Sequence, residues 1–427
     1  MTRPGYKMTE IGEIPGEWDS IKIEDPKVTE KMKAGGTPLK SVDNYYKNGT
    51  IPFVKIEDIV NSSKYLTRTL EFITDDGLNN SSTWLTPKDS ILFSMYASYG
   101  EVCINKIPVA TNQAIMSIVP TKENVDVTFL YYELKNLKNS LKQYLRSTTQ
   151  NNLNAEIVKG LKIVLPPLPE QQKIAEILST ADDAIQRVDE QITLSERLKK
   201  GLMQTLLTKG IGHMKFKVTE IGEIPEEWKV VKLGEIIEFQ YGITASASTE
   251  NSGIHLLRIT DIKDAGVKWE EIPFCKVNKA YIEKYKLNAG DVLIARIGAT
   301  TGKSCYVDRS VEGVFGSYLI RLKPRIKLIN KFLYFLTKSS LYWNQVNKMK
   351  EGQLKKGINT KLLGNLLILV PPLPEQQKIA EILLTVDEKL GLLKGRRDHL
   401  EKLKKVLMND LLTGKVRVKI EPSRGEN

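Results

Sequence analysis

Two long segments of the chain carry apolar residues at alternating steps of four and three positions. Such steps average 3.5 residues, the period of helices wound around one another, whereas a helix on a globular core follows 3.6. The pattern predicts two coiled-coil helices; the alternative is that each helix covers the core of its own domain. The predicted seam residues are Ile174, Leu178, Ala181, Ile185, Val188 and Ile192 in the first segment, and Ile379, Leu383, Val386, Leu390, Leu393 and Leu400 in the second.

Both segments begin and end alike. Residues 164–178 read VLPPLPEQQKIAEIL and residues 370–383 read VPPLPEQQKIAEIL, a repeat at a distance of 205 positions. Proline suits the first turn of a helix, and Gly210 and Gly414, which follow the two apolar patterns, suit its end. A helix over 169–207 would be about 58 Å long at 1.5 Å per residue.

The repeat extends to whole half-chains. Residues 7–18 read KMTEIGEIPGEW and residues 217–228 read KVTEIGEIPEEW. We expect both stretches to be extended and their tryptophans to anchor the entry to a domain. Runs rich in β-forming residues follow in each half, and then a helical stretch, 129–137 or 331–341. The predicted strands are 51–56, 90–96 and 114–119 in the first half, and 254–259, 291–296 and 318–322 in the second.

One α+β fold is therefore used twice. The predicted organisation is a first domain (1–166), a first long helix (167–212), a second domain (213–371), and a second long helix with a tail (372–427). The second domain starts where the first helix ends and finishes where the second helix begins. It stays compact only if the two helices run antiparallel, so the sequence predicts an antiparallel helix pair with an approximate two-fold axis.

The chain is also expected to be quasi-circular. The tail at 414–419, GKVRVK, resembles the linker at 212–218, GHMKFKV. At the first domain the tail would take the place that this linker takes at the second domain. The two ends of the chain would then meet.

Charge and cysteine content narrow the class of protein. The 427 residues include 63 Lys and Arg against 51 Asp and Glu, a formal net charge of +12. A basic excess favours binding to nucleic acid or to an acidic partner. Three cysteines without a CxxC pair argue against disulfides and zinc, and no apolar run approaches the ~20 residues of a membrane span. We therefore expect a soluble cytoplasmic protein.

Motifs for catalysis or metal binding are weak. Residues 298–304, GATTGKS, come nearest to a phosphate-binding loop, but three residues separate the glycines where four are needed. A tight turn between strands is the favoured interpretation. His213, His255 and His399 are far apart in the sequence and form no ligand pattern. The sequence therefore predicts a non-catalytic chain without a metal site.

Taken together, the TEIGEIP segments, the PPLPEQQKIAEIL hinges, the two seamed helices and the final LLTGKVRV resemble one family. This family is the specificity (S) subunit of type I restriction–modification systems, and the likeness spans essentially the whole chain. Residues 35–38 (GGTP), 111–115 (TNQAI) and 149–154 (TQNNLN) are also similar to patterns in the family's target-recognition domains. In the second half, Phe315 and Gly316 stand in place of the Asn-Gln pair.

The resemblance implies a DNA reader that is not itself an enzyme. Each target-recognition domain would read one half of a bipartite, asymmetric site on double-stranded DNA. The helices would set the unread spacer and dock two methyltransferase subunits, and restriction–translocation subunits would complete the enzyme. S-adenosylmethionine, ATP and Mg are expected on these partner subunits, with no cofactor on this chain. The alternatives are a coiled-coil scaffold without DNA readout and an ATP-binding enzyme built on Lys303.

Polar loop residues are the candidates for DNA contact, because base edges are read by hydrogen-bonding side chains and phosphates by Lys and Arg. For any single residue, a solvated loop position or a contact within the fold is the alternative. The candidates are Lys33, Thr37, Lys40, Tyr96, Tyr99, Arg146, Gln150 and Asn151 in the first domain, and Gln240, Tyr241, Thr244, Arg258, Arg296, Lys303, Gln353 and Lys355 in the second.

Overall fold

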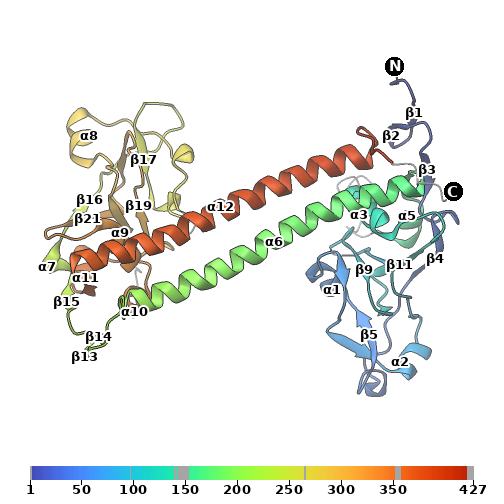
Figure 1. The fold of residues 1–427 in the computed structure, drawn as a ribbon, viewed down its shortest axis with the longest axis horizontal. Coiled ribbons are helices and arrows are strands. Elements are labelled where there is room, and N and C mark those ends of the chain that lie inside the picture. Colours follow the sequence, from blue (N-terminus) through green and yellow to red (C-terminus); the bar gives the residue numbers. More distant parts are fainter. Residues whose placement is uncertain are drawn as a thin grey trace, which may run out of the picture. The chain divides into compact units, whose positions relative to one another are not determined.

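The computed structural model describes residues 2–96, 98–138, 141, 153–263, 266–351 and 357–420. The chain divides into two compact units. Unit 1 comprises Met1–Asp189 and Arg396–Asn427, and unit 2 comprises Glu190–Gly395. Two long helices, α6 (Leu168–Leu206) and α12 (Leu373–Leu412), each contribute one part to each unit (Figure 1).

Unit 1 contains a mixed α/β domain. Its largest sheet has the strand order β4-β11-β8-β9-β6, and smaller sheets have the orders β10-β5-β7, β1-β2 and β12-β3. The strands are β1 (Tyr6–Thr9), β2 (Gly12–Pro15), β3 (Asp19–Lys22), β4 (Thr29–Ala34), β5 (Ile51–Val54), β6 (Tyr65–Leu66), β7 (Glu71–Ile73), β8 (Ile91–Ser94), β9 (Val102–Asn105), β10 (Ala110–Thr111), β11 (Ile115–Pro120) and β12 (Lys162–Leu165). The shorter helices are α1 (Ile56–Asn61), α2 (Asp75–Asn79), α3 (Val127–Leu137) and α5 (Ala155–Lys159).

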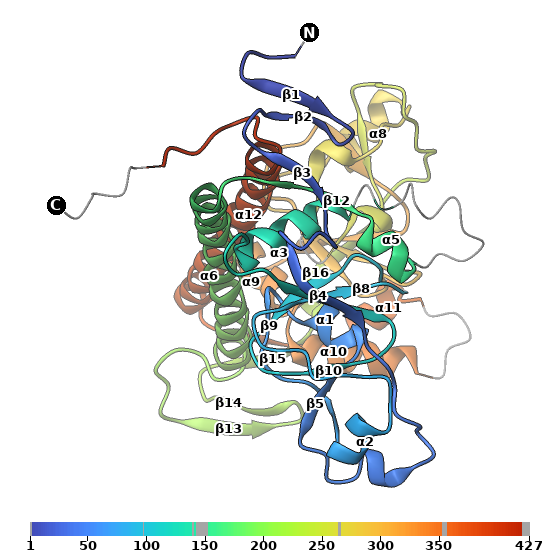
Figure 2. The ribbon, with the colours of Figure 1, turned by 90° about the vertical axis from the view of Figure 1, so that its right-hand side faces the viewer.

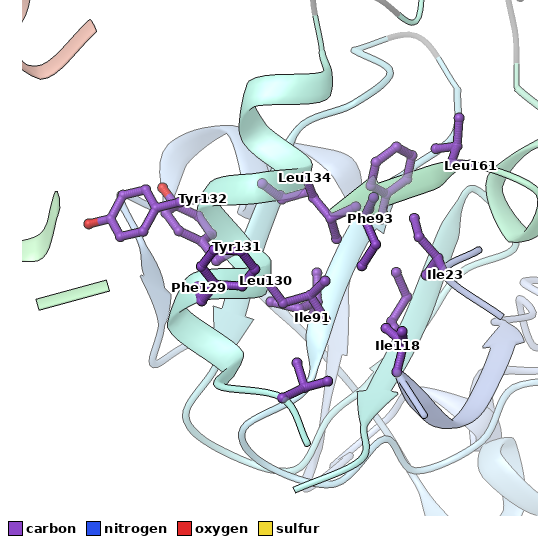
Figure 3. Packing of buried hydrophobic residues seen from close by; sticks show 14 of the residues in the cluster. Ile23, Ile91, Phe93, Ile118, Phe129, Leu130, Tyr131, Tyr132, Leu134 and Leu161 are labelled. Atoms are coloured by element: carbon purple, nitrogen blue, oxygen red, sulfur yellow. The ribbon is translucent and has the colours of Figure 1, made fainter. Parts of the chain in front are cut away.

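The strands β8, β9 and β11 of the five-stranded sheet are buried on both faces. Successive residues of a strand point to opposite faces. Ile91 and Phe93 of β8 join the core formed with α3 (Figure 3), whereas Leu92 joins a second core with Val54 of β5 and Ile59 of α1. This is why the strands read as continuous apolar runs and not as alternating patterns.

A carboxyl group of α3 lies inside the core of unit 1. Glu133 of α3 is buried, and its Oε1 accepts the backbone N–H of Val164 at 3.2 Å. Its Oε2 has no hydrogen-bond partner among the residues that the structure describes. Loss of hydration raises the pKa of Glu133 to about 8. Leu336 stands at the corresponding position of unit 2, so the repeat tolerates an apolar side chain there.

The repeated Pro-Glu-Gln motif fastens the start of α6 to its domain. The carboxylate of Glu170 is fully buried and accepts the indole N–H of Trp18 at 2.9 Å. Gln171 accepts the backbone N–H of Asp126 at the start of α3 and donates to the carbonyl of Asn124. The motif is thus a set of buried hydrogen bonds between helix and domain, and not only a helix-start signal.

The C-terminal tail completes this cluster in unit 1. Arg417 donates from Nε to Glu170 Oε1 at 2.7 Å and from Nη2 to Glu170 Oε2 at 2.9 Å, and it also bonds Glu17. The hydroxyl of Tyr6 donates to the carbonyl of Gly414 at 2.7 Å, and the N-terminal hairpin lies beside the end of α12 (Figure 2). The predicted quasi-circular path of the chain is confirmed.

Unit 2 repeats most of this architecture. Its sheets have the orders β16-β21-β18-β19, β17-β20, β13-β14 and β15-β22. The strands are β13 (Phe216–Thr219), β14 (Gly222–Pro225), β15 (Lys229–Lys232), β16 (Ile237–Tyr241), β17 (His255–Leu257), β18 (Val292–Ala295), β19 (Ser304–Tyr306), β20 (Gly313–Phe315), β21 (Leu319–Pro324) and β22 (Leu367–Val370). The shorter helices are α7 (Leu233–Ile236), α8 (Lys279–Tyr285), α9 (Asn330–Leu336), α10 (Ser340–Lys350) and α11 (Thr360–Gly364).

The start of α12 in unit 2 is fastened in the same way. Glu375 accepts the indole N–H of Trp228 at 2.9 Å, and its Oε1 lies 2.8 Å from Nε2 of His213. Gln376 accepts the backbone N–H of Ile329, next to the start of α9. The linker therefore supplies His213 where the tail supplies Arg417 in unit 1, which confirms the predicted equivalence of the two segments.

Within each unit the two long helices run antiparallel. In unit 1, Lys404 pairs with Asp182, and Arg397 Nη1 lies 4.0 Å from Asp189. The residue number rises along α6 as it falls along α12. Lys404, which interrupts the apolar seam in the sequence, is therefore part of an ion pair between the helices.

Unit 2 has the equivalent pairs. Lys199 pairs with Asp387, and Lys394 Nζ lies 2.8 Å from Glu196. The structure buries most of the apolar seam positions, namely Ile174, Leu178, Val188, Ile192, Ile379, Leu383, Leu390 and Leu393, and half-buries Ala181, Ile185, Val386 and Leu400.

Three predicted elements differ from the structure, of which one, the strand predicted at 254–259, ends at Leu257. The helical stretch at 331–341 is two helices, because the side chain of Ser339 accepts the backbone N–H of Tyr342 and starts α10. The strand at 51–56 ends at Val54, because Asp58 accepts the backbone N–H of Lys55 and begins α1. The polar loop at 147–152 lies outside the described residues.

Replacing Glu133 by Leu is expected to stabilise the protein most at high pH. The native state keeps the proton of Glu133 up to about pH 8, whereas the unfolded chain releases it near pH 4.5. Protonation of Glu133 therefore stabilises the native state at low pH, and this stabilisation is lost as the pH rises from 4.5 to 8. We expect a gain of roughly 2–4 kcal/mol above pH 8, measured by denaturant unfolding from pH 5 to 9. Glu156→Leu, which removes an exposed carboxylate, should keep the wild-type slope; an unchanged slope in E133L would contradict the assignment.

Arg417→Ala is expected to destabilise unit 1 by about 1–3 kcal/mol. The substitution removes the guanidinium that pairs with the buried carboxylate of Glu170 and leaves the indole N–H of Trp18 bound to it. Because Arg417 is partly exposed, water screens the ion pair and limits the loss of stability. Lys415→Ala removes the same charge from an exposed position of the same tail and is the matched control. Thermal unfolding of the two variants should separate them; equal melting temperatures would refute the role of Arg417.

Candidate nucleic-acid interface

In unit 1, loops from several strands converge at one edge of the main sheet. Neighbouring strands in the order β4-β11-β8-β9 are antiparallel, so β4 and β8 end where β11 and β9 begin. The loops at 35–40, 95–101 and 112–114 therefore leave the same edge. Backbone hydrogen bonds tie these loops together, from Gly36 to the carbonyl of Thr111 and from Met95 to the carbonyl of Ala114. We call this edge the first loop edge.

Unit 2 has an equivalent edge, the second loop edge. There β16 and β18 end beside the starts of β21 and β19, while β17 and the parallel strand β20 end together. The loops at 242–247, 258–263, 296–303 and 316–318 leave this edge. The backbone N–H of Gly316 donates to the carbonyl of Leu257 at 2.9 Å.

A glycine at the base of each loop edge is required by close packing of the backbone. A Cβ atom on Gly35 would lie 2.0 Å from the carbonyl oxygen of Thr111, and one on Gly242 would lie 2.2 Å from that of Phe315. No side chain fits at such distances. These two glycines explain why GGTP and YGIT occupy matching places although the surrounding residues differ.

The structure brings several predicted readers of the first domain to the first loop edge. Thr37 is exposed and its hydroxyl bonds the side chain of Gln113, and Lys40 and Tyr96 are exposed as well. Lys33 is an exposed residue of β4, one position before the strand ends. Tyr99 lies in the same loop as Tyr96 but packs against the core. Arg146, Gln150 and Asn151 fall outside the described residues.

In the second domain the predicted readers divide into two groups. Tyr241, Thr244 and Arg258 present partly or fully exposed side chains at the second loop edge. Arg296 lies over the ring of Tyr241 at 5.1 Å, and Gln240, within β16, donates to the carbonyl of Lys284, so these two side chains also hold the fold. Lys303 is half-buried. Gln353 and Lys355 fall outside the described residues.

Sequence reasoning named Arg258 as a candidate at the second loop edge but missed Asp261, the residue that fixes its side chain. Asp261 accepts the backbone N–H of Arg258 at 2.8 Å and two bonds from its guanidinium, from Nε at 3.1 Å and from Nη2 at 2.8 Å. The hydrogen bond to Asp261 raises the pKa of Arg258. A signal was present in the sequence, because Arg258-Ile259-x-Asp261 repeats the Lys55-Ile56-x-Asp58 of unit 1.

A cavity of about 400 Å³ lies beside this arginine. Three loops contribute to it, and Tyr318, also missed from the sequence, exposes its ring there. The lining residues are Ile243, Thr244, Ala245, Ala247, Leu256, Arg258, Ile259, Thr260, Gly316, Ser317 and Tyr318.

The loop at 298–304 is a turn between antiparallel strands. It joins β18 to β19, with Gly298 and Gly302 at φ values of +75° and +90°. A phosphate-binding loop leads from a strand into a helix, so the predicted tight turn is confirmed. Within the described ranges there is no cluster of His, Cys, Asp or Glu suited to a metal ion. In the same part of the chain, the search for a helix both long and apolar enough to cross a membrane found none.

Comparison with known proteins connects this architecture to one family. The family model described as type I restriction modification DNA specificity domain matches residues 15–195 and again residues 225–402. The chain belongs to this family. The two matches correspond to the two repeats, and each includes one loop edge and the first part of one long helix.

Individual specificity-family proteins resemble the chain over almost its full length. The type I restriction enzyme MjaVIII specificity subunit of Methanocaldococcus jannaschii is 30% identical over 95% of this chain and 94% of its own. The putative MjaX specificity subunit of the same organism is 31% identical over 97% of both chains. The crystal structure of a type I restriction-modification S subunit from M. genitalium shares the fold, with a TM-score of 0.59 at 18% identity, covering 96% of this chain and 99% of that one.

Proposed function

We propose that this chain is the DNA-recognition subunit of a type I restriction–modification enzyme, with each domain reading one half of a bipartite, asymmetric site. The observation that carries the proposal is the pair of loop edges. The same strand ends and the same close-packed glycine support loops of unlike sequence, as two readers of different bases require. The net charge of +12 adds salt-dependent affinity for phosphates.

We propose that catalysis belongs to partner subunits. The described residues contain no candidate metal cluster, and the loop at 298–304 is a strand-to-strand turn. In this proposal two methyltransferase subunits bind S-adenosylmethionine, and restriction–translocation subunits bind ATP and Mg. The relatives are specificity subunits by name, and one structure of similar fold comes from work on assembly of a type I system. A site of action in the cytoplasm follows from this role.

Equivalent positions on the two long helices support docking of two identical partners. Leu198 of α6 is 54% exposed in unit 2, and Leu403 of α12 is 45% exposed in unit 1. A single exposed leucine needs no explanation. These two leucines are followed by the same Lys-Lys pair, at 199–200 and 404–405. Repetition of an exposed apolar residue in this setting is expected if each helix presents the same surface to a copy of the same subunit.

Methylome sequencing of a host that carries this chain with its methyltransferase tests the function. We expect methylated adenines in a motif of two short defined sequences separated by unread bases; a continuous motif, or none, would contradict the bipartite reading.

The same measurement tests whether the helices set the spacer. Removing seven residues from each helix should shorten the unread gap and leave both defined sequences unchanged, whereas altered bases would mean that the helices do not act as a spacer.

Leu198→Glu and Leu403→Glu should each release one methyltransferase subunit. A carboxylate at the centre of an apolar contact is expected to weaken binding at least ~10-fold. Native mass spectrometry of the assembled complex should count two methyltransferase subunits in the wild type, one in each single variant and none in the double variant. Leu392→Glu is the control, because Leu392 is 77% exposed but has no apolar counterpart at residue 187. Two subunits retained in L198E and L403E would exclude this docking surface.

A further inference from the structure

Two hydrogen bonds to one carboxylate orient Arg258 at the second loop edge. It follows directly after β17, and both oxygens of Asp261 hold its guanidinium through Nε and Nη2. The carboxylate of Asp261 is only 12% exposed, while the side chain of Arg258 is 42% exposed. The acid is thus buried beneath the arginine, and the far end of the guanidinium is directed away from it.

We propose that Arg258 reads a guanine in the half-site of the second domain and that Asp261 is the residue that positions it; this inference rests on the proposed DNA-reading function. With Nε and one N–H of Nη2 engaged, the N–H groups at the far end of the guanidinium have no partner among the described residues. Two of them, one on Nη1 and one on Nη2, point in parallel. Guanine presents two acceptors, N7 and O6, side by side in the major groove, and a bidentate arginine is their commonest partner.

The two hydrogen bonds from the guanidinium of Arg258 to Asp261, here called the clamp, make this readout specific as well as strong. An arginine on a free surface loses side-chain entropy when it binds, and it swings equally well to a phosphate. Asp261 has already fixed the plane of the guanidinium, so the two donors fit a pair of acceptors at one position and orientation. A phosphate contact requires no such fixed direction.

Other arginines of the second domain are placed differently. Arg321 is buried and pairs with Asp291, and Arg296 is stacked over the ring of Tyr241. Arg309 lies between β19 and β20, at the opposite edge of the sheets. Among these arginines, Arg258 is the one whose guanidinium a carboxylate holds at the second loop edge.

The first domain lacks the same device. Lys55 takes the place of Arg258, and Asp58 accepts its backbone N–H in the same way. The ammonium group of Lys55, however, pairs with Glu71, and the second oxygen of Asp58 accepts the backbone N–H of Leu70. The repeated motif thus begins with an arginine held by Asp261 in the second domain and with a lysine neutralised by Glu71 in the first. This difference lets the two half-sites differ at this position.

The cavity beside Arg258 gives a neighbouring base room to approach. Its wall is apolar at Ile243, Leu256 and Ile259, and the exposed ring of Tyr318 stands at the same cavity. An apolar wall next to a guanine-reading arginine suits the C5-methyl group of an adjoining thymine, the apolar feature of a base edge in the major groove.

The test is methylome sequencing of a host that expresses the full chain with its methyltransferase, in wild-type, R258A, R258Q and D261N forms. We expect a guanine at one fixed position of one half-site in the wild type. R258A should make that position degenerate, with about a 5- to 150-fold loss of discrimination, the size of one bidentate base contact. R258Q should shift the preference towards adenine, because glutamine pairs with adenine N6 and N7. D261N should relax the same position and no other.

Arg309→Ala is the matched control, because it removes an exposed arginine of the same domain far from the loop edge, and its motif should equal that of the wild type. An unchanged motif in R258A and R258Q would overturn the inference. So would a fall in methylation that is uniform across all sites, since that pattern marks a phosphate contact. Each variant is judged by which bases are methylated and not by the amount of product, so reduced assembly does not conceal the answer. A wild type without a bipartite motif would overturn the proposed function itself.

Discussion

At the start of each long helix, a carboxylate leaves water and accepts the indole N–H of a tryptophan from its own domain. Removing a charge from water costs several kcal/mol unless hydrogen bonds and an opposite charge replace the lost hydration. Glu170 therefore requires Trp18 and Arg417, and Glu375 requires Trp228 and the linker that carries His213. Each carboxylate thus joins three segments of its unit: the start of the long helix, the tryptophan after the hairpin, and the segment that follows the opposite helix.

This requirement also explains why the chain closes on itself. In unit 2 the partner of Glu375 comes from the linker that follows α6, whereas in unit 1 the partner of Glu170 comes from another segment of the chain. The tail that follows α12 takes that place and brings Arg417 to Glu170. Both units are thus built from segments of the two long helices, and each helix must run antiparallel to the other for its end to reach the other's start. The closed path thus places a basic residue of the tail at the buried carboxylate of Glu170.

At the loop edges the constraint comes from close packing of the backbone and not from a buried charge. At their base a glycine is fixed by backbone atoms only 2.0 to 2.2 Å from where a Cβ would stand. Beyond the glycine several loop residues are exposed, such as Thr37, Lys40 and Thr244, so their identity is free to follow the ligand and not the fold. The contrast between Lys55 and Arg258 illustrates this freedom. Both follow a buried strand and precede a capping aspartate, yet one charge is neutralised within the domain and the other is exposed.

The sequence by itself determined the duplication, the two long helices with their antiparallel direction, the closing tail and the family. Each of these follows from periodicity and repetition, which the order of the residues alone displays. It did not determine the division of 331–341 into two helices, the ion pairs that place Lys199 and Lys404 in the helix seam, or the clamp on Arg258. Only the tertiary structure decided these, because a side chain's partner depends on which distant segments fold beside it, and a loop residue becomes a reader or a structural contact according to that partner.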